Sequence, residues 1–394
     1  MRRLYRVLIL IIFLTTLIAF VLFAKGYRFD SENISITTTG IISINSQPKA
    51  SKIFVNDQFK GVTDQNINLQ PGQYTIKITS DGYTNWQKEV NLQQGVVLSL
   101  HAHLFSKNPG LKPLTSLGIK KIVQLDNVPQ FLVLTDNANN SETKNELVLL
   151  NLESPIISLQ KEVDPILNIE ELFATNSVQL DNLDFKLSPD FTQVLIDYNN
   201  KTILADLKTK EIFANISKEQ LTTNWSSEIA KQRDLIIKSF PKELQEIASN
   251  SADILKVSPD ETKILYKAVN TAELPRVIKP SLPITQDHLD NRTIRNGKVY
   301  IYDKKNDKNY LIKPLESIDI KNEAVWHTDS QHIIFIEDQQ IKVVDIDGEN
   351  KTVLYSGPFE QNFISASPRG NIFLLINFNN NNNPYPDLYE IEIN

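Results

Sequence analysis

The chain has no cysteine among its 394 residues. Disulfide bonds, thiol nucleophiles and thiolate metal sites are therefore excluded, and so is membrane attachment through a lipid-modified cysteine. Folding must depend on the burial of apolar side chains. The chain is long enough for two domains with separate cores.

Basic residues are too few to form a surface that binds nucleic acid. The 41 lysine and arginine residues are outnumbered by 47 aspartate and glutamate residues, which gives a formal net charge of −6. A nucleic-acid partner would require a basic stripe, and the sequence contains none. We therefore expect no nucleic acid among the partners of this protein.

Signatures of catalysis are also missing. The sequence has no Gly-x-Ser-x-Gly elbow, no His-Glu-x-x-His pair, no phosphate-binding loop and no glycine-rich dinucleotide turn. His101 and His103 would share one face of a strand, but a zinc site needs three or four ligands and no third ligand is indicated. We predict no catalytic residues, no cofactor and no metal site.

A long apolar run stands at the beginning of the chain. Residues 7–24 follow three arginines and would span about 27 Å as a helix, close to the ~30 Å hydrocarbon core of a bilayer. The arginines predict a cytoplasmic tail over residues 1–6 and a transmembrane signal anchor over residues 7–24, with the bulk of the chain extracytoplasmic at the cell membrane. A second interpretation is a cleaved secretory signal, because Ala24-Lys25-Gly26 has the form of a cleavage site.

Short strands are predicted for residues 41–105, after a linker over residues 25–40. Apolar and polar residues alternate there between turn signals at Asn56-Asp57, Pro71-Gly72 and Asp81-Gly82. This pattern predicts a small β-sandwich in which each strand has one buried face. A second linker is expected over residues 106–118.

The same segment resembles the PEGA domain family. The resemblance is carried by Ile53-Phe54-Val55-Asn56-Asp57, Gly61-Val62-Thr63, Pro71-Gly72-Gln73-Tyr74 and Gly82-Tyr83. It implies a cell-surface module that spaces or presents another domain and carries no catalytic residues. Tyr83 and Trp86 are candidate contacts for a partner such as a glycan, and the alternative is that these rings complete the small core.

A repeated pattern fills residues 119–394. Each copy has a turn such as Ser258-Pro259-Asp260, then an aliphatic strand, a second turn and another strand. The equivalent positions are 70, 69 and 40 residues apart, at Ser188, Ser258, His327 and Ser367. Because about 40 residues make one propeller blade, the longer gaps predict insertions. The insertion over residues 217–250 is expected to be helical, with Ser217 and Gln220 in a capping box, and that over residues 270–297 is expected to be an extended loop.

These turns and strands resemble the TolB-like family of WD40-type repeats. The resemblance implies a β-propeller, which could close with five or six blades. In such repeats the turn aspartate accepts backbone amide protons, so Asp190 and Asp260 are expected to be structural. Trp326 belongs either to the core of a blade or, with His327, to the mouth of the propeller. Apart from the transmembrane helix and the helical insertion, the chain is predicted to be all-β.

The order of anchor, spacer and propeller predicts a membrane-anchored, extracytoplasmic binding or scaffold protein, not an enzyme, whose partner is an envelope protein or a glycan. Propellers bind through loops at one end of the ring, so the candidate partner-binding residues are Trp225, Ile229 and Arg233 in the first insertion, together with Tyr83 and Trp86. One alternative is a glycan hydrolase or lyase, which would need two carboxylates about 5–10 Å apart in the propeller mouth. Another is a purely structural envelope component.

Overall fold

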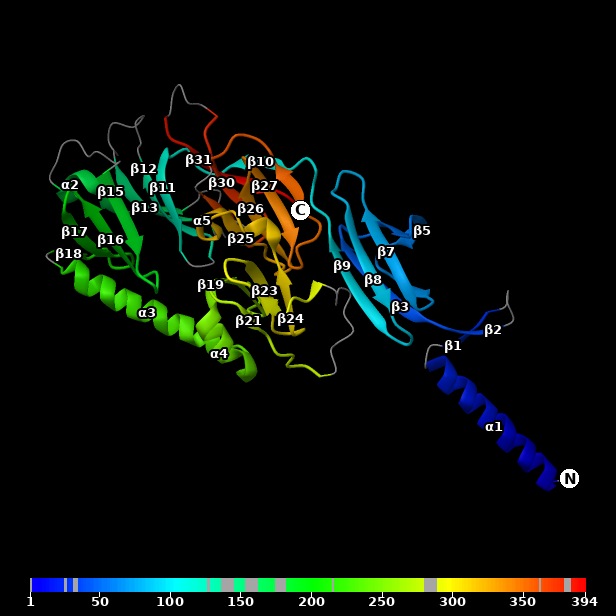
Figure 1. Cartoon of the computed structure of the whole chain (residues 1–394). Coiled ribbons are helices and arrows are strands. Elements are labelled where there is room, and N and C mark those ends of the chain that lie inside the picture. Colours follow the sequence, from blue (N-terminus) through cyan, green and yellow to red (C-terminus); the bar gives the residue numbers. More distant parts are fainter. Residues whose placement is uncertain are drawn as a thin grey trace. The chain divides into compact units, whose positions relative to one another are not determined.

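The chain divides into two compact units, which are described separately. The computed structural model describes residues 2–24, 27–30, 35–125, 128–135, 145–152, 162–173, 182–214, 216–279, 289–360, 363–378 and 384–394 (Figure 1). The first unit contains residues 1–107, 278–290 and 394, and the second contains residues 108–277 and 291–393.

The N-terminal apolar run forms helix α1, Arg2–Ala24. Its segment Tyr5–Leu22 has a mean hydropathy of 2.5 and is not buried, so it is long and apolar enough to cross a membrane as an anchor or to act as a signal sequence. The hydroxyls of Thr15 and Thr16 donate to backbone carbonyls one turn earlier, which hides their polarity within the helix. Strands β1 (Tyr27–Asp30) and β2 (Ser35–Thr38) then pair, so the segment predicted to be a linker contains a two-stranded sheet.

Residues 40–103 form a small β-sandwich. One sheet has the order β5-β4-β7-β8 and the other has the order β6-β3-β9, in which β3 and β9 are parallel. The strands are β3 (Gly40–Gln47), β4 (Lys52–Val55), β5 (Gln58–Val62), β6 (Gln65–Leu69), β7 (Gly72–Thr79), β8 (Trp86–Leu92) and β9 (Val97–His103). Alternate side chains such as Ile44, Ile53 and Ile78 are fully buried in one core, as the alternating sequence pattern predicts.

The described part of the second unit forms five antiparallel sheets of four strands each. We refer to them as the first to fifth blades: β11-β12-β13-β14, β15-β16-β17-β18, β19-β20-β23-β24, β25-β26-β27-β28 and β29-β30-β31-β10. Four-stranded sheets that follow one another along the chain are the architecture of a β-propeller, so the predicted fold class is confirmed.

The strands of the blades are short, as expected for a propeller. Their bounds are β10 (Gly110–Pro113), β11 (Ile119–Gln124), β12 (Gln130–Thr135), β13 (Glu146–Asn151), β14 (Glu162–Asn168), β15 (Leu183–Leu187), β16 (Gln193–Tyr198), β17 (Lys201–Asp206), β18 (Ile212–Phe213), β19 (Ala252–Val257), β20 (Lys263–Ala268), β23 (Val299–Asp303), β24 (Lys308–Leu311), β25 (Ala324–Trp326), β26 (His332–Glu337), β27 (Gln340–Asp345), β28 (Thr352–Tyr355), β29 (Ile364–Ala366), β30 (Ile372–Ile376) and β31 (Asp387–Glu392). Short helices α2 (Ile169–Phe173), η3 (Lys313–Leu315) and α5 (Ile320–Glu323) lie between strands.

Strand β10 completes the fifth blade although it precedes the first blade in the chain. It pairs with β31, with Leu111 opposite Ile391. Phe131 of the first blade also packs edge-on against Phe373 of the fifth, with ring centroids 5.5 Å apart. These contacts close the ring between the start and the end of the second unit. Residues 106–118, predicted to be a linker, therefore supply a blade strand.

The first insertion is helical, as predicted. It forms α3 (Lys218–Lys238) and α4 (Lys242–Ser251), and the Ser217 hydroxyl caps α3 by accepting from the backbone N–H of Gln220 at 3.3 Å. Lys218 Nζ lies 2.7 Å from Asp197 Oδ2 in the second blade. Arg233 Nη2 donates to the carbonyl of Ala252 in the third blade at 3.0 Å. Helix α3 therefore connects two neighbouring blades.

The second insertion contains a small sheet where an extended loop was predicted. Strands β21 (Ala272–Glu273) and β22 (Thr293–Ile294) pair with each other. The buried ion pair between Arg292 and Asp307, 3.0 Å apart, fixes the end of the insertion to the third blade. Residues 280–288 of the insertion, which include two of its prolines, lie outside the described residues.

Candidate functional site

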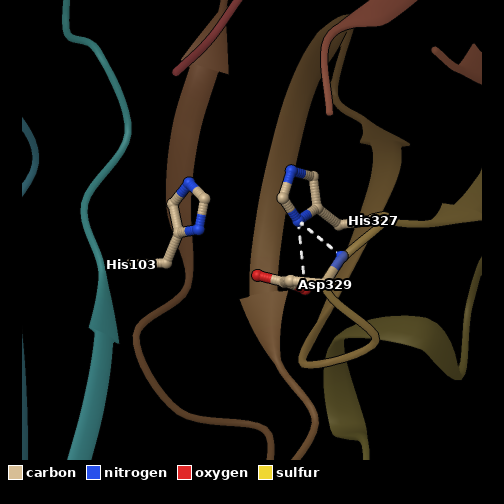
Figure 2. Close-up of side chains that lie close together, drawn as sticks. All are labelled: His103, His327 and Asp329. Atoms are coloured by element: carbon tan, nitrogen blue, oxygen red, sulfur yellow. Dashed lines mark hydrogen bonds and ion pairs between the residues drawn. The ribbon is translucent and has the colours of Figure 1, made fainter. Parts of the chain in front are cut away.

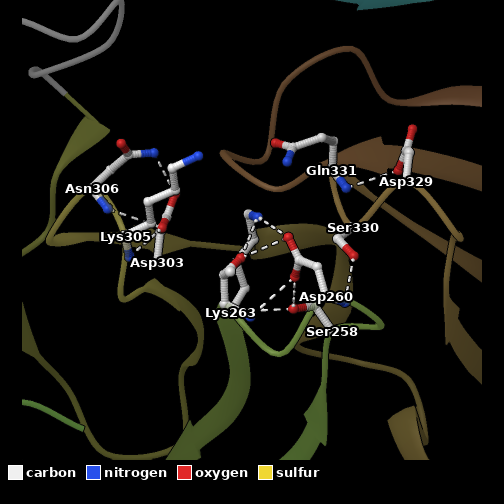
Figure 3. A network of polar contacts seen from close by, with 10 residues as sticks. Ser258, Asp260, Lys263, Asp303, Lys305, Asn306, Asp329, Ser330 and Gln331 are labelled. Carbon is white, nitrogen blue, oxygen red and sulfur yellow. Dashed lines mark hydrogen bonds and ion pairs between the residues drawn. The ribbon is translucent and has the colours of Figure 1, made fainter. Parts of the chain in front are cut away.

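The Ser-Pro-Asp turns hold the innermost strand of a blade to the next strand. In the third blade the Ser258 hydroxyl donates to Asp260 Oδ1 at 2.6 Å and accepts from the backbone N–H of Lys263 at 2.9 Å (Figure 3). Asp260 also accepts from the backbone N–H of Thr262 at 3.0 Å. Although burial opposes the shift, these hydrogen bonds lower the pKa of Asp260 below its usual range.

The same arrangement occurs in the second blade. The Ser188 hydroxyl donates to Asp190 Oδ1 at 2.6 Å, and the same oxygen accepts from the backbone N–H of Thr192 at 3.2 Å. The prediction that Asp190 and Asp260 accept amide protons within their turns is confirmed.

Four turns at the ends of innermost strands share one backbone conformation. The turns begin at Ser188, Ser258, His327 and Ser367. The fourth residue of each turn has a positive φ: Phe191 (57°), Glu261 (58°), Ser330 (58°) and Gly370 (83°). The fifth blade lacks the turn aspartate, yet Gly370 accommodates the positive φ without steric cost. The backbone turn is therefore retained where the sequence repeat is weakest.

The fourth blade replaces the serine with a histidine and forms a buried charged network. His327 Nδ1 lies 3.0 Å from Asp329 Oδ1 (Figure 2), and His332 Nδ1 lies 2.7 Å from Asp329 Oδ2. His332 Nε2 also lies 3.1 Å from Asp345 Oδ1. Burial alone would lower the pKa of His332, but the two carboxylates raise it to about 10. His332 is therefore a buried cation that links strands β26 and β27 to the turn. Figure 2 also draws His103, whose ring stacks on Phe105 within the first unit.

The innermost parts of the blades border a central cavity of about 540 Å³. This volume lies within the range of ~300–1,000 Å³ that is common for ligand pockets. All five blades contribute to its wall. Representative lining residues, in blade order, are Gln124, Phe191, Lys256, Trp326 and Ile364.

Lys256 brings a positive charge to this cavity from β19. Its ammonium group donates to the carbonyl of Lys321 at 3.3 Å, and no carboxylate of the described residues forms an ion pair with it. Asp319 lies near enough to favour protonation of Lys256, but its own oxygens accept from the backbone N–H of Lys321 and from the Asn322 side chain. Burial lowers the pKa of Lys256 to about 8 in spite of Asp319.

The rest of the wall combines apolar side chains with the polar side chains of Gln124, Asn322, Thr328 and Ser367. Val257, Phe363 and Ile364 contribute apolar surface. Trp326 is 5% exposed, and its indole N–H has no hydrogen-bond acceptor among the described residues. Trp326 is thus buried in the blade and also lines the cavity. The sequence suggests either the core of a blade or the mouth of the propeller, and Trp326 has features of both. Within the described chain, no aspartate or glutamate lines the cavity.

The predicted aromatic contacts of the first unit are largely internal. Trp86 is 3% exposed and belongs to the core of the sandwich, so it does not present a surface to a partner. Tyr83 is half-buried and packs against the same core. Of the two interpretations given for these rings, the burial of Trp86 supports the one in which they complete the small core, because its alternating position on β8 points the ring inward.

The three predicted residues of α3 do not line the cavity, and they differ in exposure. Trp225 is half-buried, whereas Ile229 is 56% exposed. The guanidinium of Arg233 donates to the carbonyls of Ser249 and Ala252, which gives it a structural role. Partner binding by α3 stays a prediction.

Sequence reasoning missed Lys256, although a weak signal for it exists. A lysine stands two residues before the turn serine in two blades, at Lys186 and Lys256. Lys186 is exposed, whereas Lys256 is half-buried and lines the cavity. The position of a lysine in the repeat therefore does not by itself show whether that lysine lines the cavity.

Comparison with known proteins identifies the first domain. Residues 39–108 match the model of the PEGA domain, which confirms the resemblance predicted for residues 41–105. A comparison with curated proteins gives no match.

Several solved structures are similar to the chain. TolB from Acinetobacter baumannii has 12% identity and a TM-score of 0.23, with 82% of this chain and 60% of that chain covered. An oligogalacturonate lyase from Vibrio parahaemolyticus has 11% identity and a TM-score of 0.27, with 81% of this chain and 86% of that chain covered. A putative TolB from Agrobacterium tumefaciens has 9% identity and a TM-score of 0.20, with 88% of this chain and 99% of that chain covered. The chain thus spans less than two thirds of the Acinetobacter protein. TolB-like propeller proteins are among its neighbours, as the sequence resemblance predicts, but similarity at this level carries no argument about its role.

Proposed function

We propose that this chain is a membrane-anchored extracytoplasmic binding protein, whose propeller receives part of a protein or glycan partner in its central cavity. The observation that carries the proposal is the cavity of about 540 Å³ lined by all five blades. Ligand sites are commonly concave and combine apolar surface with polar groups, and this cavity offers both. Helix α1 would anchor the chain with its N-terminus in the cytoplasm, and the PEGA domain would act as the spacer.

The composition of the cavity wall supports binding over glycan cleavage. Hydrolysis of a glycosidic bond usually requires two carboxyl groups on either side of the bond. Among the lining residues that the structure describes, none is acidic. We therefore propose that the cavity holds its ligand without cleaving it.

Helix α3 is a second candidate surface, because it exposes two large apolar side chains. Ile229 is 56% exposed and Leu235 is 66% exposed. Removal of residues 217–250 would not test this surface cleanly, since Lys218 and Arg233 connect α3 to two blades. Single substitutions are needed instead.

A cross-linking experiment separates the two surfaces, and the absence of native cysteine makes it direct. Single cysteines are introduced at Thr328, which lines the cavity, at Ser227 on α3 and at Glu243 on α4. Each carries a photoactivated cross-linker in envelope membranes. We expect one specific adduct from position 328 and none from position 243. An adduct from position 227 with none from position 328 would refute the cavity proposal in favour of α3.

A further inference from the structure

The charge of the cavity wall indicates which chemical group the ligand presents. Lys256 and Lys321 are the charged residues among the described residues of the wall, and both are cationic. Lys256 has one hydrogen-bond acceptor, the carbonyl of Lys321, for an ammonium group that can donate three hydrogen bonds. The nearby Asp319 is occupied at the start of α5. The wall thus holds a partly buried cation that forms no ion pair with a carboxylate of the described residues.

The uncharged part of the wall points to the same kind of ligand. The indole N–H of Trp326 also has no acceptor in the described structure, but its nitrogen is buried behind the wall, so Trp326 offers the cavity its ring and not its N–H. Phe191 and Phe363 add aromatic surface, and Val257 and Ile364 add aliphatic surface. The unused donors of the Lys256 ammonium favour a ligand group that accepts hydrogen bonds, and the aromatic and aliphatic part of the wall favours a ligand with an apolar body.

We propose that the central cavity binds an organic carboxylate, whose anionic group pairs with the ammonium of Lys256 and whose apolar body lies against the aromatic and aliphatic wall. This inference rests on the proposed binding function of the cavity and adds the chemistry of the group that is bound. A carboxylate fits better than a phosphate, because Lys321 is exposed and Lys256 is the one partly buried ammonium, which matches a single negative charge. Charge-assisted hydrogen bonds of this kind are strong. The carboxylate could belong to a free acid or to the end of a polypeptide.

Calorimetric titration of the full chain in detergent tests the proposal with matched probes. The probes are 3-phenylpropionate and its uncharged amide, which differ only in the charged group, and a short peptide that ends in phenylalanine with either a free or an amidated C-terminus. We expect the acids to bind and the amides to bind at least about tenfold more weakly, since a charge-assisted hydrogen bond is lost. Binding of the peptide acid alone would identify a polypeptide source, and binding of both acids would identify a site open to free acids.

Substitution of Lys256 supplies the second arm. Lys256→Met should lower the affinity for the acid by about ten- to hundredfold and leave the affinity for the amide unchanged. Lys256→Arg should retain most of the affinity for the acid. Lys186→Met, at the equivalent but exposed position of the second blade, is the matched control and should have no effect. Urea unfolding checks that each variant is folded.

The possible failures can be told apart. Equal binding of acid and amide, or an acid affinity unaffected by Lys256→Met, would overturn the carboxylate inference. If neither acid binds while position 328 still cross-links to a partner, the carboxylate inference fails and the proposed binding function stands. If position 328 gives no cross-link either, both fail.

Discussion

Lys256→Met should stabilise the protein, although it removes the group that we expect to bind the ligand. Burial lowers the pKa of Lys256 from 10.5 to about 8, so the folded protein holds this charge at a cost. At ~1.4 kcal/mol for each tenfold change in proton affinity, the cost is about 3 kcal/mol below pH 8. Because the side chain keeps partial access to the cavity, we expect the variant to gain about 1–3 kcal/mol in free energy of unfolding at pH 7.

The dependence on pH distinguishes this cause from a simple gain in packing. The unfolded chain holds the Lys256 proton up to about pH 10.5, whereas the folded protein releases it near pH 8. Between these values the unfolded wild type binds more protons than the folded wild type. The stability of the wild type relative to the variant therefore increases as the pH rises. The advantage of the variant should be constant below about pH 8 and should fall towards its packing contribution by about pH 10.5.

Urea unfolding of both proteins at pH 7, 9 and 10, followed by circular dichroism, measures this difference directly. Other groups titrate over this range in both proteins, so the comparison of the two at each pH removes their contribution. Lys186→Met should show no such dependence, because Lys186 is exposed. A variant advantage that is equal at pH 7 and pH 10, or that is absent at pH 7, would refute the reasoning.

Three further predictions concern the blades and the anchor. His332→Leu leaves the half-buried Asp329 and the buried Asp345 without the cation that they share, so urea titration should show a loss of ~3–5 kcal/mol in the free energy of unfolding. The loss should be full below about pH 6.5 and smaller as the pH rises towards 10, where the wild-type histidine loses its proton, and a loss that does not change with pH would contradict the charged role of His332. Gly370→Ala forces a side chain into φ 83° and should cost ~1 kcal/mol, whereas Glu261→Gly, at φ 58°, should cost less or be neutral; thermal unfolding that ranks them in the opposite order would count against the shared turn. A single cysteine at Ser227 should react with a membrane-impermeant maleimide in intact cells if α1 is an anchor with its N-terminus in the cytoplasm, and reaction only after lysis would reverse the orientation.

Local features of the fold were predictable from the sequence because they depend on neighbouring residues. The turn at Ser258 and Asp260 is formed by side chains within five residues, and the cap of α3 depends on Ser217 and Gln220. The alternation that buries Ile53 and Ile78 likewise needs only the period of a strand. Each of these predictions is confirmed.

Features that depend on distant parts of the chain were not predictable. The pairing of Leu111 with Ile391 joins segments about 280 residues apart, and nothing in residues 106–118 marks them as a blade strand. The difference between Lys186 and Lys256 arises only when the blades assemble around the cavity. The choice between a surface contact and a core position for Trp86 could not be made from the sequence, because an aromatic residue at a strand end has the same sequence signature whether it faces a partner or the core.

The three tryptophans of the chain allow one measurement to test the central claim, that ligand binds in the propeller cavity. Trp326 belongs to the cavity wall, Trp225 lies on α3 and Trp86 lies in the core of the PEGA domain, so each reports on a different candidate site. The chain, labelled with ¹⁵N at its tryptophans and assigned by Trp→Phe variants, is titrated with 3-phenylpropionate while the three indole signals are followed by NMR. The account predicts that the Trp326 signal shifts in a saturable way and that the other two stay in place. A saturable shift of Trp225 or Trp86 with Trp326 unchanged would contradict it.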